Sequence, residues 1–387
     1  MCLCLRGAVV VLLLSSGPLH AACSAEQRGG EAVIRSVMES DAAALADLLD
    51  TDALAGRVAR GLEQDDSLRS ELPKAMAAGR QRMASNLIQT LANSGMLLVA
   101  QAAPEGRTVL RKQGASLGTG IDYVEFHLDR RGCLIDWTSL MMGSPASSVI
   151  RQSMLMTRKD ASILSALFGL KQVDSEQVDR LRALADAMVK GNRQGAVEAL
   201  EQMGPLAEAS FELSVLRVGL LASDAESEAY RRALQTLAER FGDDERAQFM
   251  LIDHYYYTEE YEKGLASVDR MQARVGVDEE TELLRGGLLK LLGRHQEAES
   301  ALQRMVALAP ERSEAHGVLV GYYAEVGAHG KAVAAMRSAG ERDIEFSEQV
   351  MRADPAYAGL LASAEYAAYK GSVGVAGHDS KTGSGSR

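Results

Sequence analysis

The feature that most constrains this chain is a 34-residue period in its second half. It relates the residues Ala196, Tyr230, Gly264, Ala298 and Ala332, each 34 positions after the last. A fixed period of this length is typical of stacked helix pairs, in which each unit completes the core of its neighbour. We therefore predict an all-helical array, an architecture that usually presents a concave surface to a partner.

The array divides into five units, which start at Gln177, Phe211, Glu245, Glu279 and Ser313. Each unit should hold a first helix, a turn and a second helix. Three turns have a glycine, which adopts positive φ without steric cost: Gly191, Gly293 and Gly327. The other two units have Ala225 and Glu259 in that position, so their turns must close in another way.

Apolar residues at three-residue spacing predict the buried face of each second helix. They are Leu200 and Met203, Leu234 and Leu237, Val268 and Met271, Leu302 and Met305, and Met336 and Ala339. Two stretches, YEKGLASVDRM (261–271) and GRHQEAESALQRMVALAP (293–310), resemble the turn and second helix of the tetratricopeptide repeat family. The resemblance covers about residues 177–343, although the family's tryptophan near the start of each unit is absent here.

The resemblance implies a solenoid whose first helices line a concave groove. The positions that correspond to this groove are Arg246, Phe249, Asp253, Tyr256, Leu283, Lys290, Glu314 and Glu325. Aromatic side chains flanked by charges suit the docking of a peptide. The alternative is that these residues form a merely solvated face. Tyr255, next to Tyr256, falls in an inward position and is predicted to be part of the core.

Residues 1–25 are typical of an export leader, with Arg6, an apolar run over 7–14 and the small residues Ala21 and Ala22. Cys23 follows directly and resembles the acylated cysteine of bacterial lipoproteins, although His20 departs from that pattern. Cleavage after Ala21 or Ala25 without lipidation is the alternative. Either way we expect an exported protein, in the periplasm or lipid-anchored to the envelope of a Gram-negative bacterium. Cys133, the cysteine of the folded body, is predicted to have no disulfide partner.

An α+β domain is predicted for residues 30–145. Apolar residues at helical spacing indicate two or three helices over residues 30–95, with a break at Pro73. Strands are expected at 96–102, 108–112, 121–128 and 133–140. Helices followed by a strand meander are similar in order to the nuclear-transport-factor-like and cystatin-like cone folds, which is an analogy of fold alone.

The last hairpin of this domain has a predicted register. A four-residue loop over 129–132 would place Leu128 opposite Cys133, and Phe126 opposite Ile135. Glu125 and Asp136 would then lie opposite each other on the polar face. Three further segments complete the chain: bridging helices at 146–176, capping helices at 344–370, and a tail over 371–387 that is predicted to be disordered.

The composition and the motifs of the sequence narrow the classes of function that the protein can have. The net charge of −11 and the lack of a basic run argue against nucleic-acid binding. No catalytic or phosphate-binding signature occurs in the sequence, and we expect no metal and no cofactor. A non-catalytic scaffold with a protein or peptide partner is the main hypothesis. The alternative is a ligand-binding or catalytic module around Asp122, Tyr123, Glu125, His127 or Asp136, with the repeats for oligomerisation.

Overall fold

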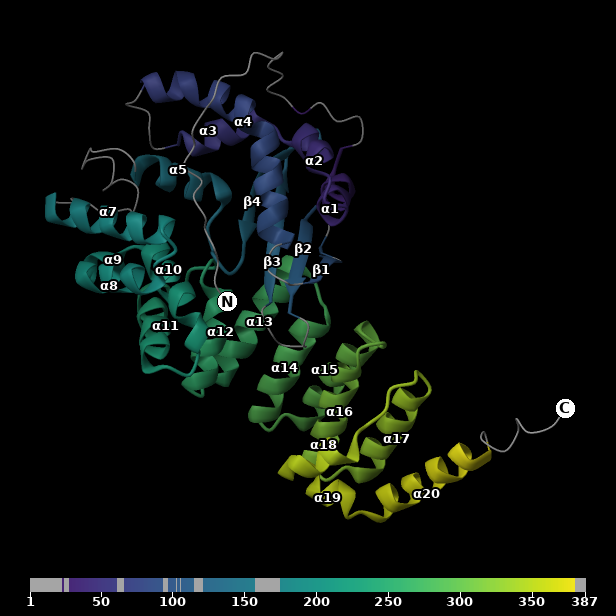
Figure 1. The fold of residues 1–387 in the computed structure, drawn as a ribbon. Helices are drawn as coiled ribbons and strands as arrows, with labels where there is room; N and C mark the ends of the chain where they lie inside the picture. The colour runs from purple at the N-terminus through teal and green to yellow at the C-terminus, as the bar shows by residue number, and fades with distance from the viewer. Residues whose placement is uncertain are drawn as a thin grey trace. The chain divides into compact units, whose positions relative to one another are not determined.

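The computed structural model describes Cys23 and residues 28–60, 66–92, 97–101, 103–104, 106–114, 121–156 and 175–379. These residues form two compact units, one ending at Val277 and the other starting at Asp278. Figure 1 labels the helices and strands of both units.

The first unit begins with four helices: α1 (Gly30–Met38), α2 (Ala42–Leu48), α3 (Thr51–Val58) and α4 (Asp66–Ala92). Aspartates start two of them, because Asp41 accepts the backbone N–H of Ala43 and Asp50 accepts that of Ala53. The predicted break at Pro73 is wrong, since α4 continues through it. Leu72 and Met76 are buried on either side of the proline, and their burial offsets the lost backbone hydrogen bond.

The four predicted strands are confirmed: β1 (Leu97–Gln101), β2 (Thr108–Gln113), β3 (Asp122–Leu128) and β4 (Leu134–Ser139). They form one antiparallel meander in the order β1-β2-β3-β4. The predicted register of the last hairpin is wrong. Phe126 pairs with Trp137, and Asp136 lies opposite His127 instead of Glu125.

Two local features cause this shift of register. The backbone N–H of Asp129 bonds the carbonyl of Cys133, which shortens the loop to residues 130–132, and Gly132 takes φ +78° there. A β-bulge between His127 and Leu128 adds a second displacement. The two one-residue displacements together preserve parity, so Val124 and Phe126 still face the core.

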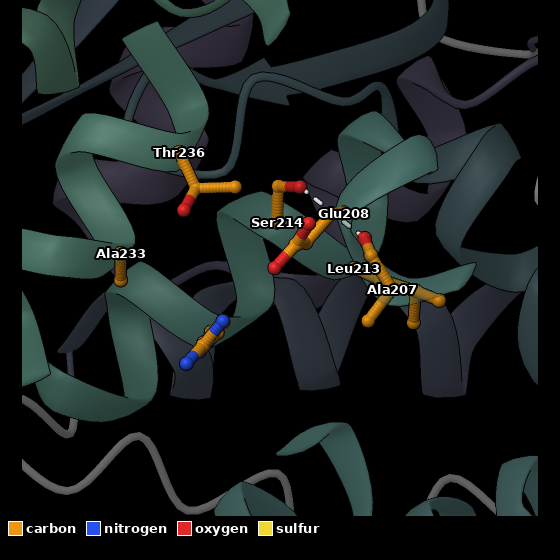
Figure 2. Close-up of a pocket in the computed structure, with 7 residues that line it drawn as sticks. Ala207, Glu208, Leu213, Ser214, Ala233 and Thr236 are labelled. Carbon is orange, nitrogen blue, oxygen red and sulfur yellow. Dashed lines mark hydrogen bonds between the residues drawn. The ribbon is translucent and has the colours of Figure 1, made fainter. Parts of the chain in front are cut away.

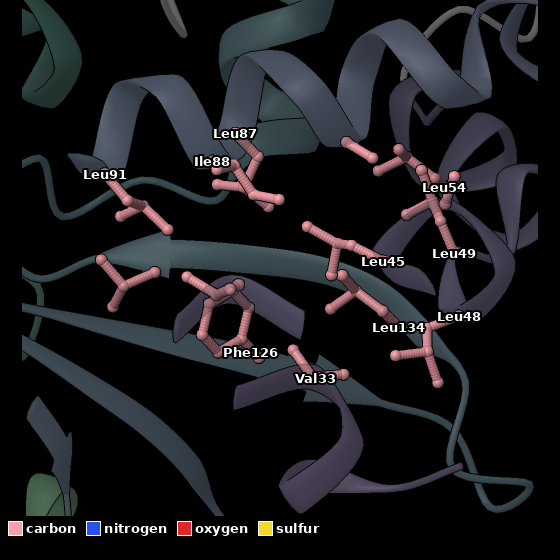
Figure 3. Close-up of a cluster of buried hydrophobic side chains, with 14 of the residues drawn as sticks. Val33, Leu45, Leu48, Leu49, Leu54, Leu87, Ile88, Leu91, Phe126 and Leu134 are labelled. Atoms are coloured by element: carbon pink, nitrogen blue, oxygen red, sulfur yellow. The ribbon is translucent and has the colours of Figure 1, made fainter. Parts of the chain in front are cut away.

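The hydrophobic core of the α+β part lies between the sheet and the helices. Figure 3 shows Leu87, Ile88 and Leu91 of α4 pointing toward the strand layer, where Phe126 and Leu134 lie. Leu45 and Leu48 of α2 and Val33 of α1 complete the same cluster. One face of the sheet is therefore apolar and covered by helices. The other face carries Tyr123, Glu125 and His127.

Helix pairs follow the sheet in the first unit. After α5 (Ala146–Met156), residues 157–174 of the predicted bridge lie outside the described residues. The helices that follow are α7 (Ser175–Val189), α8 (Arg193–Met203), the short α9 (Pro205–Ala209), α10 (Phe211–Leu221), α11 (Glu228–Phe241), α12 (Gln248–Tyr257) and α13 (Tyr261–Val275). The helices pack in pairs, α7 with α8, α10 with α11, and α12 with α13, as a helix-pair array requires.

The turns inside these pairs close both with and without glycine. Gly191 has φ +66°, as predicted. Glu259 takes the same left-handed region at φ +59°, although it is not a glycine. Ala225 stays right-handed, and its turn closes through a 3₁₀ segment, η1 (Ala222–Asp224). The two units without glycine therefore use two different solutions.

The second unit holds the last two helix pairs, α14 (Glu279–Leu291) with α15 (His295–Leu308), and α16 (Ser313–Glu325) with α17 (His329–Gly340). Gly293 and Gly327 have φ +72° and +73° in their turns, as predicted. α18 (Glu348–Ala353), η2 (Pro355–Tyr357), α19 (Ala358–Leu361) and α20 (Ala364–Asp379) follow.

The predicted boundary of the tail is wrong at its start. α20 continues past Gly371 to Asp379, because a helix that has formed adds one hydrogen bond for each further residue that it orders. Residues 380–387 lie outside the described residues.

The close packing of α14 on α15 can be tested with two adjacent glycines. A Cβ at Gly286 would lie 2.6 Å from Cδ2 and 2.8 Å from Cγ of Leu302, whereas a Cβ at Gly287 has no atom within 4 Å. We expect Gly286→Ala to lower the free energy of unfolding by about 1–3 kcal/mol. Gly287→Ala should raise it by about 0.5–1 kcal/mol through helix propensity alone. Thermal unfolding followed by circular dichroism measures both, and equal effects would contradict the packing described here.

Candidate interaction surface

α12 presents the first part of the predicted groove. Its inward side chains are buried: Met250, Leu251, His254 and Tyr255. The prediction that Tyr255 is a core residue is confirmed. Arg246 lies just before the helix, and Phe249, Asp253 and Tyr256 follow it at helical spacing on another face.

Arg246 is held by its own neighbourhood. Its guanidinium lies 3.9 Å from the centre of the Phe211 ring and bonds the Asp244 carboxylate, Nη2 to Oδ2, at 2.7 Å. The hydrogen bonds from Arg246 lower the pKa of Asp244, and the same contact raises the pKa of the guanidinium. Arg246 therefore orders the connection between α11 and α12, and its charge is already neutralised locally.

Phe249 is half-buried and contacts the chain's own sheet. Its ring meets the ring of Tyr123 edge-on, with the centres 6.2 Å apart, and Tyr123 is fully buried. The loop after β4 lies close by, since a Cβ at Gly143 would be 2.9 Å from Cζ of Phe211 and 3.0 Å from the carbonyl oxygen of Arg246. The amino-terminal half of α12 is thus packed against the α+β part and is not an open groove.

An ion pair joins the same two parts of the first unit. The Glu125 carboxylate on β3 accepts a hydrogen bond from Arg274 of α13 at 2.9 Å, and a second from Arg107 at 2.8 Å. Glu125 is buried, where an unpaired carboxylate would be costly. The two arginines give each of its oxygens a charged partner. The polar face of the sheet therefore serves as the contact with α12 and α13.

The carboxyl-terminal half of α12 remains accessible. Asp253 accepts a hydrogen bond from the Tyr230 hydroxyl at 2.9 Å. Its side chain keeps exposed surface, yet the atoms that crowd the carboxylate raise its pKa, and the bond from Tyr230 only partly offsets this. Burial first, and then the charge of Asp253, raise the pKa of Tyr230. Asp253 is thus oriented by α11 at the rim of an open surface.

Two tyrosines dominate that open surface. Tyr256 is 54% exposed and Tyr257 is 36% exposed, and their ring centres are 5.9 Å apart. The Tyr257 hydroxyl donates to the carbonyl of Ala225, and the Arg231 guanidinium lies 4.9 Å from the centre of its ring. We call Arg231, Asp253, Tyr256 and Tyr257 the tyrosine patch. The sequence reasoning missed Arg231 and Tyr257; the run of three tyrosines was the available signal for the latter.

The remaining groove candidates belong to the second unit. Leu283 is half-buried and Glu314 is exposed in the first turn of α16. Lys290 and Glu325 bond each other at 2.8 Å, between α14 and α16. This pair neutralises both charges, so it offers little to a charged ligand. A binding role for these four residues stays a prediction.

The polar residues of the sheet are engaged in structural hydrogen bonds. The buried Asp136 accepts the Ser147 hydroxyl at 2.5 Å and the backbone N–H groups of Ser147 and Trp137. Asp122 accepts the Ser139 hydroxyl at 2.8 Å, and its burial raises its pKa. His127 shares a 2.8 Å hydrogen bond with the Thr138 hydroxyl, and burial lowers the pKa of its ring. These contacts do not favour the catalytic alternative.

Two hollows in the described residues lie away from this sheet face. One has a volume of about 10 Å³, room for a single water, and Figure 2 shows that Ala207, Glu208, Ser214 and Thr236 are among the residues that line it. The Ser214 hydroxyl there already donates to the carbonyl of Ala207. The other, of about 300 Å³, is open and is lined by Ala55, Gly56, Ala59, Arg60, Arg69 and Pro73.

Cys133 has a partner, which corrects the sequence prediction. It forms a disulfide with Cys23, across 110 positions of sequence. The sequence prediction missed the pair because Cys23 falls within residues 1–25, which are predicted to be the leader.

Within the described ranges, no group of three histidine, cysteine or acidic side chains is placed to hold a metal ion. No described helix combines the length and apolarity needed to cross a bilayer.

No family model matches the chain, and no curated protein matches it. Among solved structures, MamA from AMB-1 is similar, with 19% sequence identity, a TM-score of 0.34, and coverage of 45% of this chain and 95% of that chain. A likeness at this level carries no weight for function.

Proposed function

We propose that this protein is a non-catalytic interaction module that binds a protein or peptide partner at the tyrosine patch. The observation that carries the proposal is the exposed pair Tyr256 and Tyr257 at the end of α12, which packs against α11 and α13. Tyrosine and arginine are enriched among the residues that dominate binding energy, because they bury large area at low entropic cost. Arg231 and Asp253 add one charge of each sign beside the rings.

The accessible part of the groove is shorter than the sequence suggested. Because Phe249 packs on Tyr123, a partner would reach only the carboxyl-terminal end of α12 and the adjoining turn. The membership of the tetratricopeptide family and the concave mode of binding are parts of this proposal. So is export to the bacterial envelope, which the composition of residues 1–25 and the disulfide support, since disulfides persist in oxidising compartments.

A site-specific crosslinking experiment tests the tyrosine patch. A photoreactive phenylalanine analogue at position 256, in cells that produce the full chain, should give a discrete crosslinked species. The same analogue at Met38, which is 45% exposed on α1, should give none. Crosslinking at both positions alike, or at neither, would contradict the proposal.

Substitution then measures the contribution of the tyrosines to binding. For the partner identified by crosslinking, Tyr256→Ala with Tyr257→Ala should weaken the Kd by about 10–100-fold. Met38→Ala, a control of similar exposure, should leave the Kd unchanged. Phe249→Ala is a poor test, because it removes a contact with the sheet and would disturb the fold. An unchanged Kd in the double variant, with an unchanged Tm, would overturn the assignment of the site.

A further inference from the structure

The segment that precedes α1 is fastened to the hairpin of β3 and β4 by a covalent bond. Cys23 and Cys133 form a disulfide, with their Cα atoms 5.9 Å apart, which lies in the usual range for such bonds. Both cysteines are buried, Cys133 completely. The folded protein therefore shields the completed bond from solvent, and the two thiols are joined while the chain is still folding.

Backbone contacts hold the same segment independently of the sulfur atoms. The N–H of Gly29 donates to the carbonyl of Gly132 at 2.9 Å, and the Arg28 guanidinium reaches the carbonyl of Cys23 at 3.4 Å. A Cβ at Gly132 would lie 2.8 Å from the backbone nitrogen of Gly29, so glycine is needed for this approach. Residues 28–29 therefore lie along the hairpin turn, which brings Cys23 within reach of Cys133.

We propose that Cys23 is retained in the mature protein as half of this disulfide, and that the leader is cut on the amino-terminal side of Cys23. The Sγ atom of Cys23 can form either the disulfide or a thioether to a lipid, and not both. Acylation as in a lipoprotein would consume Sγ as a thioether, and cleavage after Ala25 would remove the residue altogether. Of the alternatives that the sequence leaves open, only cleavage before Cys23 without lipidation preserves the bond. The inference rests on the export part of the proposed function.

The bond forms by thiol–disulfide exchange with an external disulfide oxidant. One cysteine thiolate attacks the oxidant, forms a mixed disulfide and releases one thiolate of the oxidant. The second cysteine thiolate attacks the first cysteine sulfur and releases the other thiolate. The protein loses two protons and two electrons, and the oxidant is reduced to two thiols.

Peptide mapping of the natural product tests the inference. The full gene is expressed with its own leader in a Gram-negative host, and free thiols are alkylated at lysis. A non-reducing digest should contain the Cys23 peptide linked to the Cys133 peptide, lighter by two hydrogen masses than the two peptides together. The amino terminus should be Ala22 or Cys23. An acylated Cys23, an amino terminus beyond Cys23, or alkylation of both cysteines would overturn the inference.

Two further arms separate this result from a failure of export. If the leader is uncut, the purified full chain is reduced, unfolded and then refolded with oxidised glutathione, and Cys23 should pair with Cys133 in preference to Cys2 or Cys4. Pairing with Cys2 or Cys4 would overturn the inference even then. In the exported protein, Cys133→Ser should abolish the linked peptide and lower the Tm by about 5–15 °C, and this difference should shrink in reductant, where only the cost of the buried serine hydroxyl remains.

Discussion

Replacing Asp136 by alanine is expected to lower the free energy of unfolding of the first unit by about 3–5 kcal/mol. The carboxylate is fully buried and accepts the Ser147 hydroxyl and the backbone N–H groups of Ser147 and Trp137. Alanine removes every acceptor at once and leaves buried donors without partners, and each such donor costs about 1–3 kcal/mol. The connection from β4 into α5 should loosen first, because Ser147 belongs to α5.

The chain contains a convenient probe for this measurement. Trp137 is its single tryptophan and follows Asp136 directly, so urea unfolding can be monitored by its fluorescence. Asp136→Asn should cost only about 1 kcal/mol, because one oxygen still accepts and the Ser147 hydroxyl can rotate to accept from the amide. The exposed Asp243→Ala should change stability by less than about 0.5 kcal/mol. Equal losses at Asp136 and Asp243 would refute the network.

Phe126→Ala is expected to cost about 3–5 kcal/mol of unfolding free energy. Phe126 is 2% exposed and pairs with Trp137 across the strands, under α4 (Figure 3). Removing the ring leaves a cavity between the sheet and α4, which a strand fixed by hydrogen bonds on both sides cannot collapse to fill. The emission of Trp137 should shift to the red, because water gains access to its indole.

An apolar residue of the same sheet serves as the control. Leu97 begins β1 and is 57% exposed, so Leu97→Ala should change stability by less than about 0.5 kcal/mol. A loss below about 1 kcal/mol in Phe126→Ala would show that the core is looser than the structure indicates.

Local pattern was enough to predict the elements. The 34-residue period places helix pairs where the structure has them, and the five apolar pairs of the second helices are all buried. This succeeded because a helix exposes and buries residues in a fixed rhythm, which the sequence records directly. The strands were predicted for the same reason, through their two-residue rhythm.

Predictions failed where the chain departs from the commonest local geometry. Pro73 ordinarily ends a helix, yet the burial of Leu72 and Met76 carries α4 through it. The hairpin register depended on the Asp129 loop and a bulge, each of which moved the pairing by one residue. Neither the shorter loop nor the bulge produces a periodic pattern in the sequence.

The sequence by itself therefore determined the helix pairs, the antiparallel meander and the burial of Tyr255. Only the tertiary structure decided that Tyr123 packs against Phe249, that Glu125 pairs with Arg274, and that Cys23 reaches Cys133. The physical reason is that secondary structure follows from interactions a few residues apart. Contacts between residues more than a hundred positions apart depend on how the helices and strands pack together. A single sequence contains no periodic pattern that records this packing.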